Sequence, residues 1–267
     1  MIGIEKVSFD ESNFTFYLSG YLKEEYGIVF CFTNRIGGYS KEKFGSLNVG
    51  YHTGDNNMNV KRNREIILKK LGLGGATKIY SAEQIHGDRI LDIGRELNLE
   101  NDNINEKADC LITDLKDVPV MVMGADCNLI LMADTKSKVV AAVHAGWRGT
   151  LQGIVSNVVS YMKERFKSGK GDIVAAFGPS IRKCCYKVDK ILIEKFTEKF
   201  DSGDFFEIRE NDYFLDLVKV NRMQLKEAGI NDDNIYDCRE CTFCNHSFYS
   251  YRRSGITGRQ GAIAAIL

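Results

Sequence analysis

The chain has 267 residues, of which 44% are hydrophobic, enough to build one large or two small hydrophobic cores. Its 36 basic and 36 acidic residues give a formal net charge of zero, which argues against nucleic acid or an anionic membrane as a partner and favours a small-molecule substrate. The first residues carry acidic side chains and no apolar run of signal-peptide length, so we expect a cytoplasmic protein, a monomer or a weak oligomer.

Apolar runs rich in β-branched and aromatic residues predict strands at 27–33, 77–82, 118–124, 128–134, 138–145, 172–177 and 262–267. Several of these runs are apolar on both faces, so the strands need cover on two sides. The connection between the runs at 128–134 and 138–145 is short, which favours a hairpin and therefore a mixed sheet over a purely parallel one.

Helical spacing is clearest between Leu151 and Met162 and predicts a helix that begins near Thr150 as its N-cap. Weaker patterns predict helices over 58–71, 188–200 and 214–228. No internal repeat or linker divides the sequence. We therefore expect a single-domain α/β (α+β) sandwich over residues 1–267, with a mixed β-sheet core covered by helices.

The stretch VHAGWRGT, Val143 to Thr150, contains one of the four histidines and the only tryptophan of the chain. Gly146 and Gly149 allow a tight turn from a strand into a helix, and Arg148 beside a helix N-terminus suits a phosphate or carboxylate. An ordinary glycine turn with a solvated arginine fits the same residues. Trp147 is then either a lid on a pocket or a wedge in the core.

Two further runs carry metal-binding side chains: His86 follows a predicted strand in EQIHGD, and Cys127 precedes one in GADCNLILMAD. With His144 they make a His2Cys set, which suits zinc and leaves a fourth position open for water or substrate. The spacing is long-range, so buried, hydrogen-bonded side chains are the alternative. Asp126, next to Cys127, either orients a histidine, shuttles a proton or serves as a capping carboxylate.

The run DCRECTFCNHSFYSYRRSG places cysteines two residues apart, at Cys238, Cys241 and Cys244, as in a zinc knuckle. No second ligand pair lies at the spacing of a zinc finger, because Cys184 and Cys185 are adjacent and fall in a predicted turn. The basic, glycine-bearing continuation suits either an anion site or a solvated loop, with Arg252, Arg253 and Arg259 as its cations.

Taken in order, the motifs resemble those of the YfiH-like, laccase-domain family, regarded as zinc-dependent purine nucleoside phosphorylases and formerly described as multicopper polyphenol oxidases. The residues that carry the resemblance are NRIGGYS, SLNVGYHTGD, NVKRNRE, QIHGD, ADCLITD, GADCNLILMAD, VVAAVHAGWRGT, FGPSIRKCCYKV and CTFCNHSFYSYRRSGITGRQGAIAAI. Gly124, Asn128 and Cys110 depart from the family pattern without removing a ligand.

The resemblance implies a zinc site formed by His86, Cys127 and His144. It also implies phosphorolysis of adenosine, inosine and methylthioadenosine to a base and ribose 1-phosphate, with adenosine deamination as a side activity. We expect Cys127, His144 and Asp126 to be the catalytic residues. The phosphate candidates are Arg148, Arg35, Arg252 and Arg253.

Other functions stay open at this point. A dedicated zinc deaminase lacks support because its H-x-E and P-C-x-x-C motifs are missing. Four histidines are too few for a multicopper oxidase, but a copper-dependent polyphenol oxidoreductase with one blue-copper site at the same residues is conceivable. A metal-free hydrolase would use Cys127 as a nucleophile activated by His144. A non-enzymatic protein that binds a nucleotide-like anion is the remaining alternative.

Overall fold

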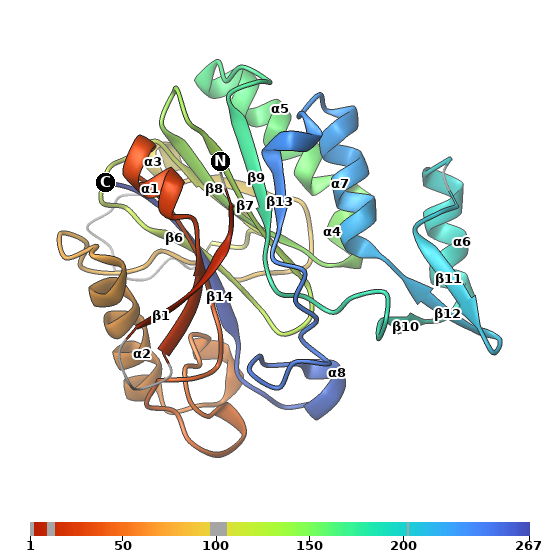
Figure 1. Ribbon diagram of the computed structural model, residues 1–267, viewed down its shortest axis with the longest axis horizontal. Helices are drawn as coiled ribbons and strands as arrows, with labels where there is room; N and C mark the ends of the chain where they lie inside the picture. Colours follow the sequence, from red (N-terminus) through yellow and green to blue (C-terminus); the bar gives the residue numbers. More distant parts are fainter. Residues whose placement is uncertain (1–2, 10–13, 97–105, 202) are drawn as a thin grey trace.

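The computed structural model describes residues 3–9, 14–96, 106–201 and 203–267. Its first sheet is antiparallel throughout (Figure 1). The strands of this sheet, in spatial order, are β1 (Glu5–Phe9), β2 (Phe14–Leu18), β3 (Ile28–Thr33), β14 (Gln260–Ile266) and β6 (Val120–Gly124). The strand near the end of the chain therefore lies inside the sheet, between β3 and the edge strand β6.

The second sheet is mixed, because its two outermost pairs are parallel and the pairs between them are antiparallel. Its strands, in spatial order, are β13 (Ile235–Asp237), β9 (Ile173–Phe177), β7 (Asn128–Asp134), β8 (Val139–Ala145), β5 (Cys110–Thr113) and β4 (Ile90–Asp92). The predicted mixed sheet and the predicted β7–β8 hairpin are both confirmed.

The two sheets pack face to face, and side chains alternate along each strand because successive residues point to opposite faces. Leu129 and Leu131 of β7 belong to the same buried core as Phe30 and Phe32 of β3. Ile130, from the opposite face of β7, packs in a second core under helices. Burial on both faces explains why these strands are apolar along their whole length.

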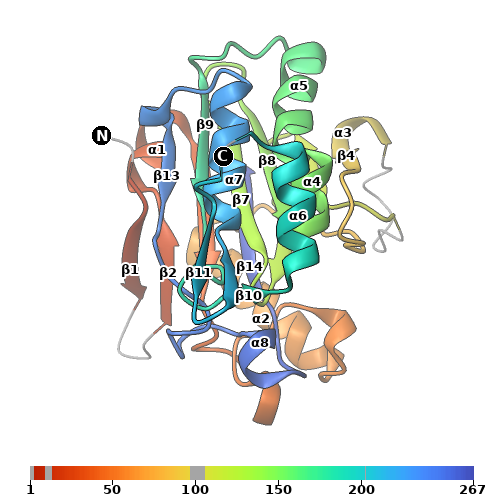
Figure 2. The same cartoon turned by 90° about the vertical axis from the view of Figure 1, so that its right-hand side faces the viewer.

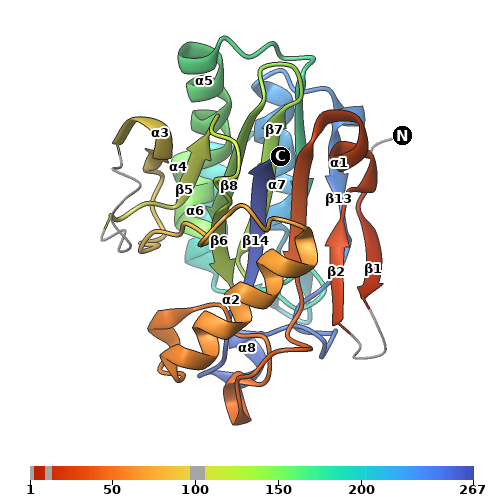
Figure 3. The same ribbon diagram turned by 90° about the vertical axis from the view of Figure 1, so that its left-hand side faces the viewer.

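Helices cover both outer faces of the sandwich. Figure 2 shows α5 (Ile154–Phe166) and α7 (Leu217–Glu227) over the mixed sheet, and Figure 3 shows α2 (Asn57–Leu71) across the antiparallel sheet. The predicted α/β sandwich with a helix-covered mixed sheet is thus confirmed. Short helices complete the fold: α1 (Gly20–Tyr26), α3 (Ile93–Glu96), α4 (Trp147–Gln152) and α8 (Tyr251–Ser254), with 3-10 turns at Glu42–Phe44, Tyr51–Thr53 and Asp232–Asn234.

A small three-stranded sheet stands at one side of the sandwich with α6 (Lys190–Lys199) against it (Figure 1). Its strands are β10 (Lys187–Val188), β12 (Asp212–Leu215) and β11 (Phe206–Arg209), all antiparallel. Trp147 is partly buried against the core of this unit. Its side chain therefore joins α4 to the small sheet, as a packing residue.

Two local predictions were wrong. Residues 77–82 form no strand; Tyr80 makes only an isolated bridge to Val120, and Arg64 donates to the Ile79 carbonyl and the Ser81 hydroxyl beside it. The helix expected from Thr150 begins at Trp147 and breaks at Gly153, whose φ of +83° suits glycine because it lacks a Cβ. Thr150 is no N-cap; its hydroxyl accepts a hydrogen bond from Asn221.

The predicted helix over 58–71 is confirmed, and those over 188–200 and 214–228 are shorter than expected at their starts, where β10 and β12 lie instead. The edge strands β1, β11 and β13 are half-exposed or short, so they lack the long apolar run that reveals a central strand. Within the described ranges, no helix combines the length and apolar content that a membrane span requires.

Candidate metal centre and cavity

His86, Cys127 and His144 lie together, with one ligand atom of each within 4.8 Å of the others. The β7–β8 hairpin brings two of them side by side: Cys127 directly precedes β7, and His144 pairs with Leu129 near the end of β8. His86 reaches the same point from the loop before β4, with its ring edge-on to that of His144, at 88° and 4.8 Å between centroids.

Asp109 organises this cluster, although the sequence analysis did not single it out. It lies directly before β5, the neighbour of β8, and its Oδ1 is 2.8 Å from Nδ1 of His144. The same carboxylate accepts hydrogen bonds from the backbone N–H groups of Ile85, His86 and Gly87, at 2.7–3.2 Å. One fully buried side chain therefore positions two of the three ligands.

The Asp109 contact assigns the tautomer of His144, because an ionised carboxylate accepts the proton on Nδ1 and leaves Nε2 to face Cys127. Burial raises the pKa of Asp109, but hydrogen bonds from His144 and the backbone outweigh this effect and lower it. The sequence signal for this role was an acidic residue at the start of a strand, in the motif ADCLITD.

Charge in the cluster is strongly coupled. Burial raises the pKa of the Cys127 thiol, but the facing rings of His144 and His86 outweigh burial and lower it to about 6. Burial lowers the pKa of His144, whereas Cys127 and Asp109 raise it to about 9. Without a bound cation, Cys127 and His144 therefore form a thiolate–imidazolium pair near neutral pH, and a metal cation would replace the imidazolium proton.

The backbone around the cluster is shaped for close approach. A Cβ added to Gly146 would lie 3.1 Å from Cδ2 of His86 and 3.3 Å from Sγ of Cys127, so only glycine leaves the ligands room. Asp126 has a φ of +110°, an unusual value for a residue with a side chain, and it directs the chain into β7 just after Cys127. Its backbone carbonyl is held by the N–H of Ile181.

The donor set fits zinc. Two imidazoles and a thiolate suit this borderline-soft ion, three protein ligands leave a fourth position for substrate, and Asp109 provides the carboxylate partner that ligand histidines require. His144 is almost fully buried, while His86 is exposed on the side of the cavity. The ligand cluster thus has one protected and one open side.

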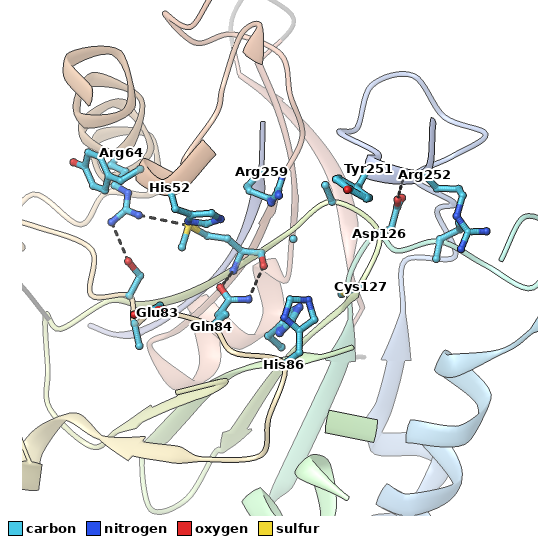
Figure 4. Close-up of a pocket in the computed structure, with 18 of the residues that line it drawn as sticks. His52, Arg64, Glu83, Gln84, His86, Asp126, Cys127, Tyr251, Arg252 and Arg259 are labelled. Atoms are coloured by element: carbon cyan, nitrogen blue, oxygen red, sulfur yellow. Dashed lines mark hydrogen bonds between the residues drawn. The ribbon is translucent and has the colours of Figure 1, made fainter. Parts of the chain in front are cut away.

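The open side faces a cavity of about 660 Å³, a size typical of sites for small organic ligands. Its lining combines tyrosines with charged and polar groups (Figure 4). The lining includes Tyr51, His52, Arg64, Glu83, Gln84, His86, Asp126, Cys127, His144, Tyr186, Tyr251, Arg252 and Arg259.

Cations gather in the cavity wall. Figure 4 shows Arg64 and His52 on one side, Arg252 on the other, and Arg259 between them above Cys127. Burial, followed by Arg259 and Arg64, lowers the pKa of His52 and keeps this ring neutral. Burial also lowers the pKa of Arg259, although Cys127 and Asp126 oppose the effect. The part of the cavity wall that carries Arg64, Arg259 and Arg252 is therefore a positively charged region that suits an anion.

Of the arginines predicted to bind phosphate, Arg252 lines the cavity, and the side chains of the other three make different contacts. Arg148 is exposed and stacks on Trp147, 4.4 Å from its ring centroid. Arg35 stacks on Tyr249 and donates to the Gly45 carbonyl. Arg253 donates to three backbone carbonyls, of Thr242, Phe243 and Phe248. Sequence reasoning had singled out Arg259 only within a basic run, and it missed Arg64.

Asp126 lines the cavity, but both of its carboxylate oxygens have partners. Oδ1 accepts a hydrogen bond from the Thr242 hydroxyl at 2.6 Å, and Oδ2 accepts one from the backbone N–H of Arg252 at 2.7 Å. These contacts tie the Cys127 turn to the start of α8. Among its expected roles, the geometry favours that of a capping carboxylate.

Comparisons with known proteins extend over nearly the whole chain. A family model described as multi-copper polyphenol oxidoreductase laccase matches residues 29–267. A purine nucleoside phosphorylase of Haemophilus influenzae is 34% identical over 236 residues, which cover 86% of this chain and 91% of that protein. The purine nucleoside phosphorylase YlmD of Geobacillus stearothermophilus is 34% identical over 245 residues, covering 87% and 88%.

Solved structures share the fold. The crystal structure of YlmD from Geobacillus stearothermophilus has a TM-score of 0.86 and 32% identity, and the match covers 98% of this chain and 99% of that one. The crystal structure of the hypothetical protein YfiH from Bacillus licheniformis has a TM-score of 0.84 and 31% identity, with 94% and 96% covered. The similarity therefore includes both sheets and their helical cover.

Proposed function

Because this chain belongs to the family described as multi-copper polyphenol oxidoreductase laccase, and relatives that match 86% and 87% of its length are named purine nucleoside phosphorylases, we propose that it is a zinc-dependent purine nucleoside phosphorylase. The family resemblance seen in the motifs is thereby confirmed. One observation carries the proposal: the His86, Cys127 and His144 cluster opens into a cavity that has both an arginine-rich wall and tyrosines.

The proposed substrates are adenosine, inosine or methylthioadenosine together with phosphate. The cavity of about 660 Å³ is large enough for a nucleoside and an oxyanion at once. Tyr51, Tyr186 and Tyr251 offer aromatic faces for the purine and the sugar. Glu83 adds an exposed carboxylate that suits hydroxyl or amino donors of the nucleoside.

In phosphorolysis, a phosphate oxygen bonds to C1′ of the sugar while the bond from C1′ to the purine breaks. The base leaves with the electron pair of that bond and takes up the proton that hydrogen phosphate gives up. The sugar develops oxocarbenium character in the transition state, as in glycoside cleavage. We assign phosphate to Arg252 and Arg259, because the charge of two guanidinium groups offsets that of the nucleophile and holds it in place. Zinc, when bound, would supply a Lewis acid at the open ligand position.

The expected catalytic residues take separate roles in this proposal. Cys127 and His144 hold the metal, with Asp109 as the positioning residue behind His144. Asp126 holds the backbone of Arg252 and so fixes one wall of the phosphate site. The hydrogen bonds of the Arg259 side chain use Nη1, so Nη2 and Nε make none within the described residues and suit an oxyanion.

Alternative chemistry at the same residues makes distinguishable predictions. A blue-copper oxidoreductase would be intensely coloured. A metal-free hydrolase with Cys127 as nucleophile would keep its activity after exhaustive chelation. An anion-binding protein without turnover would bind nucleosides and release no base. An adenosine deaminase side activity, with water as nucleophile, would convert adenosine to inosine without phosphate.

The test is to incubate the purified protein with each nucleoside, with and without phosphate, and to quantify free base and ribose 1-phosphate by chromatography. We expect phosphate-dependent base release by the wild type, loss of release in Cys127→Ala, and retention in Cys238→Ser as the matched cysteine control. Equal product from wild type and Cys127→Ala would refute the site assignment, and base release independent of phosphate would refute phosphorolysis.

A further inference from the structure

Four more cysteines converge at a place that shares no residue with the His86, Cys127 and His144 cluster. Their sulfur atoms all lie within 4.8 Å of one another, and the four residues are Cys184, Cys185, Cys241 and Cys244. Sγ of Cys244 lies 3.9 Å from that of Cys184 and 3.3 Å from that of Cys185. All four are free thiols in this structure. Local sequence spacing concealed the set, because its two halves are more than fifty residues apart.

We propose that Cys184, Cys185, Cys241 and Cys244 form a second metal site, a structural tetrathiolate site for one zinc ion. Four sulfur atoms at about 2.3 Å from one ion lie about 3.8 Å from each other in a tetrahedron. The separations of 3.9 Å and 3.3 Å lie on either side of this value, and all four sulfur atoms lie within 4.8 Å of one another. A multi-iron cluster would need wider spacing, because iron and sulfide ions fill the space between the cysteines.

The protein backbone holds the two cysteine pairs together without help from a metal. Ser180 and Cys241 form a parallel bridge, in which the N–H of Thr242 donates to the Ser180 carbonyl at 3.0 Å. The N–H of Cys185 donates to the Arg182 carbonyl at 2.9 Å and closes a tight turn. The ligands are therefore preorganised, which lowers the entropic cost of binding an ion.

Cys241 sits in a backbone environment suited to a thiolate ligand. The backbone N–H groups of Cys244, Arg182 and Phe243 face its sulfur. Two of these donors lie two and three residues after Cys241, within the turn C-T-F-C. Such N–H groups stabilise negative charge on sulfur in the same way as they stabilise any bound anion.

Two arginines flank the cysteine turns and would offset part of the charge of a tetrathiolate zinc site, which is −2 overall. Arg209 donates to the carbonyls of Lys183 and Cys184. Arg253 donates to the carbonyls of Thr242 and Phe243 from the other side, and it is attracted to Cys241. Cys185 and Cys241 are partly shielded, so the site has an enclosed half and a solvent-facing half.

The site would fix one wall of the main cavity. Thr242, between two of the cysteines, donates to Asp126, and Tyr186, next to Cys185, lines the cavity. The same chain segment leads into α8, which carries Tyr251 and Arg252. Zinc at the four cysteines would thus hold the segments that present these side chains, without touching the substrate.

The experiment is a zinc count on protein purified without chelators, by elemental mass spectrometry. Wild type should carry two equivalents of zinc per chain, and Cys127→Ala and Cys244→Ser should each carry one. Cys238→Ser is the matched control, because it alters the same cysteine run outside the four-sulfur cluster, and it should keep both equivalents. X-ray absorption of Cys127→Ala, which retains only the proposed site, should give four sulfur ligands at about 2.3 Å.

Two measurements on the wild-type protein test the proposal even if a variant fails to fold. Besides Cys127, zinc should protect four more cysteines from alkylation, and titration with a mercurial should release the second zinc ion in a separate step. Three results would each overturn the proposal. The wild type could carry a single zinc equivalent that Cys127→Ala abolishes, it could carry iron in place of zinc, or its intact mass could be lower by the two hydrogens lost in forming a disulfide. None of these readouts depends on phosphorylase activity, so the two proposals fail separately.

Discussion

The Asp109 carboxylate lies 2.8 Å from Nδ1 of His144 and at the same time holds the backbone N–H groups of the loop that carries His86. Two ligands that are 58 residues apart in sequence are therefore positioned by one side chain. An acidic group behind a ligand histidine fixes its tautomer and makes the imidazole a stronger donor. The metal affinity of the cluster should depend on this carboxylate.

Asp109→Asn should lower zinc affinity about 10-fold to 100-fold, because the amide keeps the size of the side chain but loses the charge that orients His144. Competition against a chromogenic chelator measures the affinity. Asp114→Asn, at the exposed end of the same ADCLITD motif, is the control and should leave it unchanged. Unaltered zinc affinity in a folded Asp109→Asn protein would contradict the role assigned to this residue.

Gly146→Ala tests the space around the ligands. The added methyl group would lie 3.1 Å from the His86 ring and 3.3 Å from the Cys127 sulfur, so one of them must shift. The φ of −69° suits alanine, so we expect weaker zinc binding, about 10-fold, with little change in Tm. Gly171→Ala, where nothing lies within 4 Å, is the matched control. A drop in Tm without a change in zinc affinity would show that Gly146 serves packing alone.

The central strands could be predicted from sequence because burial on both faces makes them continuous apolar runs. The β7–β8 hairpin was predictable for a local reason, its short connection, and it carries Cys127 and His144 to one place. The third ligand, His86, was a candidate from its residue type alone; no local spacing links it to the other two, and the family resemblance supplied the link. Residues 77–82 form no strand because only Tyr80 pairs with a neighbouring strand, while the Ile79 carbonyl and the Ser81 hydroxyl accept hydrogen bonds from Arg64.

The rest of the site depends on contacts between distant segments. The Asp109 contact with His144 spans 35 residues, and its sequence signal, one acid before a strand, is common. Arg259 enters the cavity because β14 pairs between β3 and β6 in the first sheet, which no local pattern reveals. The cysteine pairs at 184–185 and 241–244 meet through the isolated bridge at Ser180. The sequence indicated a metal-binding pattern only for the pair at 241–244.

Arg259→Gln should raise the KM for phosphate about 10-fold to 100-fold, since a hydrogen bond to a charged group contributes roughly 1.5–3 kcal/mol. Steady-state kinetics at saturating nucleoside measure it. Arg62→Gln, an exposed position on α2, is the control for loss of a positive charge and should leave the KM unchanged. A higher KM for the nucleoside with an unchanged KM for phosphate would assign Arg259 to the other substrate.

Asp134 closes the far end of the β7–β8 hairpin, where it pairs with Val139 in the same register that pairs Leu129 with His144. Its Oδ1 accepts hydrogen bonds from the backbone N–H groups of Lys136 and Ser137, both at 2.8 Å. Burial raises the pKa of Asp134, but Ser168 and these N–H groups outweigh it and lower the pKa. A lowered folded-state pKa means that the ionised carboxylate stabilises the fold.

Asp134→Asn should therefore lower the free energy of unfolding by about 1 kcal/mol at pH 7, because the amide oxygen accepts the same bonds without a charge. The wild-type contribution is complete above the unfolded-state pKa, about 3.9, and disappears as the pH falls through the folded-state value. Urea unfolding of both proteins between pH 7 and pH 3 measures the difference, which should shrink only below about pH 4. A difference that stays constant over this range would mean that the Asp134 charge contributes nothing and that shape alone holds the hairpin.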